Sequence, residues 1–124
     1  MMVEFLKKNA EAFCENAKDL FRKGILNLAA FNIEQGFQLY LKYFLAIKLG
    51  EYPKTHSLRE LFKEASKLCR KLWEFYLDNT GGIGNIESAY IMSRYLPTEF
   101  TNAEVEEMMR LFEKFKEVLR SCLS

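Results

Sequence analysis

Apolar residues recur along most of the chain at every third or fourth position, the spacing that gathers them on one side of an α-helix. No stretch keeps the alternation of apolar and polar residues that is typical of a β-strand. The pattern predicts an all-α domain, an antiparallel up-and-down bundle of four long helices plus one short helix. The long helices are expected over residues 3–22, 25–49, 57–76 and 101–122, and the short one over 86–96.

Two predicted helix starts have the sequence of a capping box, in which a Ser or Thr and a Glu three residues later bond each other's backbone N–H groups. They are Ser57 with Glu60 and Thr101 with Glu104. Residues 79–85 read Asn-Thr-Gly-Gly-Ile-Gly-Asn, a composition that predicts a mobile loop. This segment follows no strand and has no Lys-Ser/Thr ending, so it matches neither kind of glycine-rich nucleotide-binding loop.

The segment 25–49 is apolar at most positions, which is typical of a helix at the centre of a bundle or in a subunit interface. Its polar members Gln35, Gln38 and Lys42 share one face. Partly buried polar groups need hydrogen-bond partners. These residues could line a nucleotide pocket, or they could pair across a two-fold axis with their counterparts in a second subunit. We prefer the second interpretation, which makes Gln35 and Gln38 dimer-interface candidates.

The charge balance limits the kinds of partner that the chain could attract. The 124 residues include 18 Lys and Arg against 17 Asp and Glu, so the net charge is close to zero. Bulk electrostatics therefore predicts strong binding neither to nucleic acid nor to a membrane, and any attraction to phosphate has to be local. With no linker or repeat, residues 1–124 are expected to form a single domain.

The three cysteines, Cys14, Cys69 and Cys122, lie far apart, and the chain has no CxxC motif or Cys/His cluster. This spacing indicates neither structural zinc nor a disulfide framework. The N-terminus lacks the apolar run of a signal peptide, and charged residues interrupt the most apolar segment. We therefore expect a cytoplasmic protein without a membrane span, a metal or a cofactor.

Three short motifs follow one another in a characteristic order between residues 31 and 97. The first is a Gln-Ala-x-Glu-x-x-x-Lys pattern, matched by Gln35 and Lys42, with Gly36 in place of Ala and Gln38 in place of Glu. The second is Thr-His-x-Leu-x-x-Leu, matched by Thr55, His56, Leu58 and Leu61. The third is Arg-Tyr-Pro, matched by Arg94 and Tyr95, with Leu96 inserted before Pro97. In the order and spacing of these motifs the chain resembles the HEPN family of small α-helical domains.

The resemblance implies a helical bundle that commonly forms homodimers and associates with nucleotides or RNA. Many members are ribonuclease toxins paired with a small nucleotidyltransferase antitoxin. Those nucleases carry an Arg-x4-6-His motif, whose Arg stabilises phosphate charge and whose His helps proton transfer. Here no Arg precedes His56 at that spacing and no His follows Arg94, so no catalytic residue is assigned.

The resemblance makes Lys42, His56, Arg94 and Tyr95 the candidates for contact with a nucleotide or RNA. Arg94 could bind a phosphate and Tyr95 could stack on a base, or Arg94 could pair with a carboxylate such as Glu34. For His56, the position just before the Ser57 cap favours a structural role over a catalytic one. A basic stripe on the third helix is expected to be a solvated face, although it could bind phosphate; its members are Arg59, Lys63, Lys67 and Arg70.

The sequence thus predicts a non-catalytic HEPN-like domain that binds a nucleotide, RNA or a nucleotidyltransferase partner, with a toxin–antitoxin module as one setting. One alternative is a metal-independent endoribonuclease that uses Arg94 or Arg70 with a partner other than His. The other is a purely structural homodimeric assembly protein.

Overall fold

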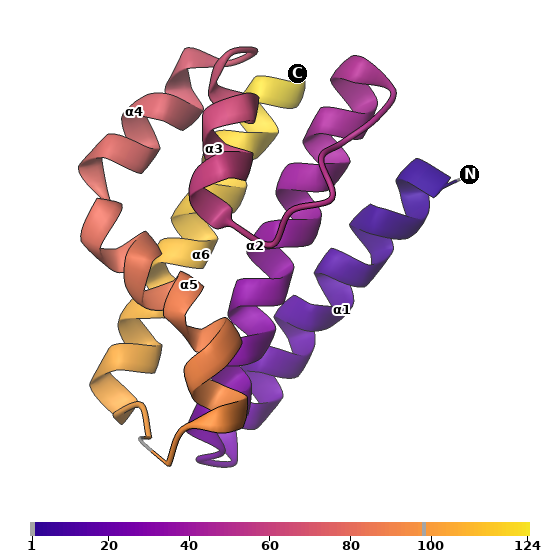
Figure 1. The fold of residues 1–124 in the computed structure, drawn as a ribbon. Coiled ribbons are helices and arrows are strands. Elements are labelled where there is room, and N and C mark those ends of the chain that lie inside the picture. The colour runs from indigo at the N-terminus through magenta and orange to yellow at the C-terminus, as the bar shows by residue number, and fades with distance from the viewer. Residues whose placement is uncertain (1, 98) are drawn as a thin grey trace.

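The computed structural model describes residues 2–97 and 99–124, and these residues form six helices and no strand. Figure 1 shows the helices side by side, with α2 running through the middle of the assembly and α1 on its outer side. The all-α prediction is confirmed. The helices are α1 (Met2–Arg22), α2 (Leu26–Leu49), α3 (Leu58–Ser66), α4 (Arg70–Asp78), α5 (Thr80–Tyr95) and α6 (Asn102–Leu123).

The ends of the long helices agree with the sequence pattern. Gly24 and Gly50 follow α1 and α2 with φ angles of +76° and +80°, in the left-handed region that Gly adopts without steric cost. At the start of α6, Thr101 and Glu104 form the predicted capping box. At the start of α3, the Ser57 hydroxyl accepts from the Glu60 N–H at 3.2 Å, but the Ser57 N–H donates to the Thr55 hydroxyl instead of to Glu60.

The core is built on α2, which packs against α1, α3, α5 and α6. The Phe37 ring of α2 is fully buried and stacks on Phe112 and Phe115 of α6, with centroids 5.0 and 4.5 Å away. Phe62 of α3 closes the same cluster, 6.2 Å from Phe37. Aromatic rings packed in this way add to the burial of apolar surface. The prediction that 25–49 is a central helix is confirmed.

Two predicted segment boundaries are wrong. The third long helix is two helices, because the chain turns after Ser66 and Cys69 has an extended backbone. Residues 79–85, predicted to be a mobile loop, lie almost entirely within α5, which begins at Thr80. Ile83 and Ile86 are buried in the core, and the burial of these side chains outweighs the low helix propensity of the neighbouring glycines. Within residues 2–97 and 99–124 the bundle therefore has six helices rather than five.

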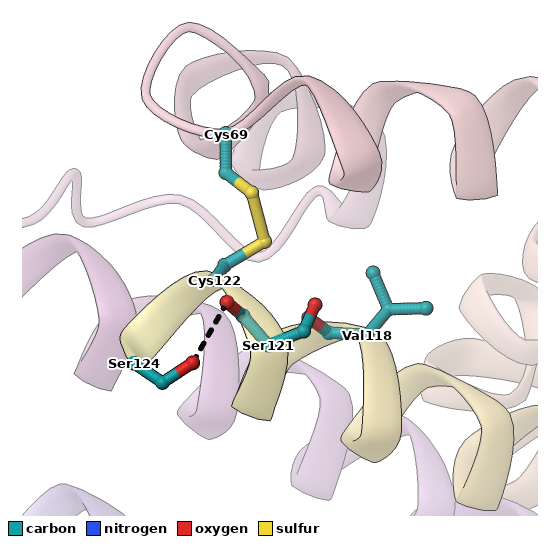
Figure 2. Close-up of a disulfide and its surroundings, with 5 residues drawn as sticks. All are labelled: Cys69, Val118, Ser121, Cys122 and Ser124. Carbon is teal, nitrogen blue, oxygen red and sulfur yellow. Dashed lines mark hydrogen bonds between the residues drawn. A yellow bond between two sulfur atoms is a disulfide. The ribbon is translucent and has the colours of Figure 1, made fainter.

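Cys69 and Cys122 form a disulfide that joins the turn between α3 and α4 to the last turn of α6, as Figure 2 shows. The expectation that the chain carries no disulfide is therefore wrong. Residues 53 positions apart in the sequence were brought together only by the fold. Cys14 is free and buried. The cytoplasmic location stays a prediction, and disulfides are more typical of oxidising compartments.

None of the helices in residues 2–97 and 99–124 combines the length and the apolar character needed to cross a bilayer.

We expect Gly36→Ala to destabilise the fold. A Cβ atom at Gly36 would lie 2.5 Å from Cζ of Phe112, so the Phe112 ring would have to shift out of its stack on Phe37. Overpacking of this kind exceeds the gain in helix propensity, so the free energy of unfolding should fall by about 1–2 kcal/mol. Gly84→Ala is the matched control, because a Cβ there meets no atom within 4 Å, and it should stabilise α5 by about 0.5–1 kcal/mol. Urea unfolding of both variants measures the difference, and equal effects would contradict the close packing.

The disulfide should contribute to stability through the unfolded chain, whose entropy it reduces. For a separation of 53 residues, loss of the bond is expected to cost about 4 kcal/mol. Thermal unfolding with and without a reductant measures the effect. The variant with both Cys69→Ser and Cys122→Ser should melt at the temperature of the reduced wild type and show no response to the reductant. A wild type whose melting temperature does not change on reduction would contradict the contribution.

Candidate functional site

A buried carboxylate on α2 lies at the centre of the polar residues that the sequence analysis singled out. The Glu34 side chain is fully buried, and its Oε1 accepts a hydrogen bond from the Gln35 amide at 2.8 Å. Its Oε2 accepts from the amide of Gln38, itself almost fully buried. Gln35 and Gln38 thus have a partner within the subunit. Their pairing with a second subunit stays a prediction.

Burial raises the pKa of Glu34 to about 7, because the charged form loses its hydration. The hydrogen bonds from Gln38 and Gln35 lower the pKa and offset part of this effect. On α5, the charge of Glu87 raises the pKa further and that of Arg94 lowers it. A carboxyl group in this environment changes its ionisation near neutral pH.

His56 reaches this cluster from the loop between α2 and α3. Its Nδ1 lies 3.3 Å from Oε1 of Gln38, and its ring stacks on Tyr90 of α5 with the centroids 5.0 Å apart. The residue as a whole is exposed. The partners of the imidazole are therefore side chains of α2 and α5, and a catalytic role for it has no support from a second acid or base within hydrogen-bond distance among the described residues.

Arg94, near the end of α5, lies among three aromatic rings. Its guanidinium carbon is 4.4 Å from the centroid of Tyr90, 4.9 Å from that of Tyr95 and 5.0 Å from that of Phe31. Rings this close attract a cation through their electron-rich faces. The Nε–H donates to the Tyr90 carbonyl at 2.9 Å. No ion pair to Arg94 occurs within residues 2–97 and 99–124, so the pairing with Glu34, one of its two predicted roles, is not formed.

Two residues of α5, Tyr90 and Glu87, complete the site, and no motif in the sequence indicated either of them. Tyr90 contacts both His56 and Arg94, so a single ring joins two side chains far apart in the sequence. Glu87 accepts from the Leu58 backbone N–H at 3.0 Å, which fixes the start of α3 to α5. Tyr90 lies within the predicted short helix, but no motif distinguished it from a core residue.

Of the other two predicted contact residues, Tyr95 lies at the site and Lys42 lies elsewhere on the surface. Tyr95 is 68% exposed beside Arg94. Lys42 is half-buried, with its Nζ 5.8 Å from the centroid of Tyr52. Burial lowers the pKa of Lys42, and the charge of Glu34 acts in the opposite direction.

The predicted basic stripe does not run along a single helix. Arg59 and Lys63 lie on α3, which ends at Ser66, whereas Arg70 begins α4. Two of its members have acidic partners: Lys67 pairs with Glu64 at 2.8 Å and Arg70 with Glu74 at 3.9 Å. The four side chains therefore do not follow one helical face.

A groove of about 740 Å³ lies away from the polar cluster, between α1 and α6. Its floor includes Ala17, Phe21 and Phe112, and its rim carries acidic and basic residues together, so its charge selects no class of ligand. The described residues include no group of three or more His, Cys, Asp or Glu arranged to hold a metal ion. The polar cluster formed by Glu34, Gln38, His56, Tyr90 and Arg94 is thus the site with the more distinctive chemistry.

Residues 3–122 match the family model of the HEPN domain. The match covers nearly the whole chain, and the chain belongs to this family. None of the curated proteins matches it. The resemblance found in the three sequence motifs is confirmed, and the structure adds that His56 of the second motif and Arg94 of the third meet at one ring.

The raised pKa of Glu34 predicts how stability depends on pH. In the unfolded chain the carboxyl group ionises near its ordinary value of 4.5, whereas in the folded chain it keeps its proton up to about pH 7. Between these values the folded state binds more protons at Glu34, so the contribution of this group to stability falls as the pH rises and is lowest above 7. The shift corresponds to a penalty on the order of 3 kcal/mol.

Glu34→Gln removes this titration and leaves a side chain that Gln35 and Gln38 can both hydrogen-bond. Relative to the wild type, the variant should gain stability as the pH rises from 4.5 to 7, as measured by urea unfolding at a series of pH values. Glu117→Gln, at an exposed position of α6, is the control and should follow the wild type. A constant difference between Glu34→Gln and the wild type would contradict the raised pKa.

Proposed function

We propose that the chain binds the phosphate and base of a nucleotide or of an RNA strand at a surface formed by His56, Tyr90, Arg94 and Tyr95, and does not cleave its ligand. We call these four residues the Tyr90 surface. The observation that carries the proposal is that His56 and Arg94, from different segments, both lie against the Tyr90 ring and are both exposed.

The chemistry of the Tyr90 surface suits a nucleotide. A guanidinium presents several N–H donors in one plane, an arrangement that matches the oxygens of a phosphate. No carboxylate within the described residues forms an ion pair with Arg94, so its charge is available to an anion. The exposed ring of Tyr95 lies 4.9 Å from the guanidinium carbon and can stack on a base. Because the net charge of the chain is only +1, this attraction is local rather than spread over the molecule.

A second function, metal-independent cleavage of RNA, is favoured by one observation. Although the Arg-x4-6-His motif is absent from the sequence, the fold brings an Arg and a His to the same ring. Arg70, the other candidate for this role, lies on α4 and pairs with Glu74. We prefer binding over cleavage because the imidazole has no acid or base beside it, within the described residues, to orient it for proton transfer.

Membership of the HEPN family supports a homodimer and a small nucleotidyltransferase as partners, and we include both in the proposal. The exposed side chains of Ile91 and Leu96 lie close in sequence to Arg94 and Tyr95. Exposed apolar groups beside a polar site are common in protein interfaces. A toxin–antitoxin module is one setting in which such a complex would act. A purely structural role would leave the Tyr90 surface without a ligand.

Arg94→Ala should weaken the binding of a short fluorescent RNA and of AMP by about 10-fold or more, because a hydrogen bond to a charged group contributes about 1.5–3 kcal/mol. Fluorescence anisotropy and thermal shift at low salt measure the change. Arg120→Ala removes an exposed Arg of α6 far from the Tyr90 surface and is the matched control.

The same samples, incubated with EDTA, distinguish the three functions. Intact RNA with binding that depends on Arg94 supports the proposal. Cleavage that Arg94→Ala abolishes would establish the ribonuclease instead. The absence of binding by either ligand would overturn both and leave the assembly role.

A further inference from the structure

Glu34, Gln38 and His56 form a chain of hydrogen bonds from the core to the surface. The Gln38 amide nitrogen donates to Oε2 of Glu34. The amide oxygen of Gln38, Oε1, lies 3.3 Å from Nδ1 of His56. Glu34 is fully buried and Gln38 is 3% exposed, whereas His56 is exposed. One amide therefore connects a buried acid to an imidazole that solvent can reach.

The ionisation of Glu34 decides which groups donate and which accept along these hydrogen bonds. An ionised carboxylate can only accept hydrogen bonds, so Gln38 has to turn its NH₂ group toward Glu34. The amide oxygen of Gln38 then faces His56. Because that oxygen is an acceptor, Nδ1 of a neutral imidazole has to carry the proton, and Nε2 is left as an acceptor.

A proton on Oε2 of Glu34 reverses these requirements. The carboxyl group now needs an acceptor, which Gln38 supplies if its amide turns by half a rotation. The NH₂ group then faces His56, so Nδ1 becomes an acceptor and the imidazole proton moves to Nε2. Gln38 is enclosed, so when its oxygen turns to accept from Oε2 of Glu34, its NH₂ group turns toward His56.

We propose that Gln38 couples the ionisation of Glu34 to the tautomer of His56, so that the surface nitrogen of the imidazole is an acceptor when Glu34 is ionised and a donor when it is protonated. Glu34 and Gln38 are positioning residues in this scheme. The charged and titratable groups around these three side chains are Glu87, Tyr90 and Arg94 on α5, Lys42 on α2, and His56 itself. The raised pKa of Glu34, about 7, places the change near neutrality.

One consequence rests on the proposed function. Phosphate oxygens accept hydrogen bonds, so a phosphate on the Tyr90 surface favours the form in which His56 presents a donor. Ligand binding would then take up a proton at the chain of Glu34, Gln38 and His56, and affinity would fall as the pH rises above 7. The coupling itself needs no ligand.

Nitrogen-15 NMR of the imidazole tests the coupling directly, because His56 is the single histidine of the chain and gives an unambiguous signal. At a pH well above the pKa of Glu34, Nδ1 should show the shift of a protonated nitrogen and Nε2 that of an unprotonated one. As the pH is lowered, the carbon-13 shift of the Glu34 carboxyl group reports its protonation. In the neutral imidazole, which the two nitrogen shifts distinguish from the cation with protons on both nitrogens, the proton should move from Nδ1 to Nε2 in step with that change.

Two variants distinguish the effect of the Glu34–Gln38–His56 hydrogen bonds from that of neighbouring residues. Gln38→Met removes the link, so the tautomer should no longer follow Glu34. Gln35→Met is the control. It removes the hydrogen bond to the other oxygen of Glu34, Oε1, which is not linked to His56, so the coupling should remain. If the neutral imidazole of the wild type keeps its proton on Nδ1 throughout the titration, the proposal is overturned, and this result does not depend on the variants folding.

A separate experiment tests the proposed function. Titration of the wild type with AMP by calorimetry, in buffers of different ionisation heat, measures proton uptake on binding. A tautomer that switches in a protein that binds neither AMP nor RNA would overturn the function and leave the coupling. Binding without proton uptake would overturn the consequence for the ligand.

Discussion

The fold depends on the enclosure of α2 by four other helices. The stack of Phe37 on Phe112 and Phe115 holds α6 against this helix, and Phe62 brings α3 onto the same cluster. An α-helix that is covered on most sides has no free face on which to expose its polar residues. Glu34 and Gln38 therefore have to find their partners inside the protein, and this requirement produces the polar cluster.

Burial of Glu34 costs stability, and the cost is only partly offset. The two glutamine amides satisfy both carboxylate oxygens, yet no basic side chain in the described part of the chain forms an ion pair with them. A fold that needed only stability would place an apolar residue at this position. The polar cluster is more readily explained by what it holds at the surface, namely the imidazole of His56.

The second organising contact is the ring of Tyr90. It lies between the loop that carries His56 and the end of α5 that carries Arg94, so two motifs of the HEPN family meet at one aromatic side chain. Stacking fixes both groups without neutralising the charge of Arg94. In this way the family's sequence motifs become a surface with a defined arrangement of cation, imidazole and exposed ring.

Much of this protein could be predicted from the sequence, because helix formation and capping depend on residues close together in the chain. The spacing of apolar residues gave α1, α2 and α6 and the central position of α2, and the three motifs gave the family. Interactions between distant residues could not be predicted. The pairing of Cys69 with Cys122, the helix over residues 80–85 and the roles of Tyr90 and Glu87 all depend on which surfaces meet in three dimensions. Local spacing carries no information about such contacts, and only the packing of the helices decided them.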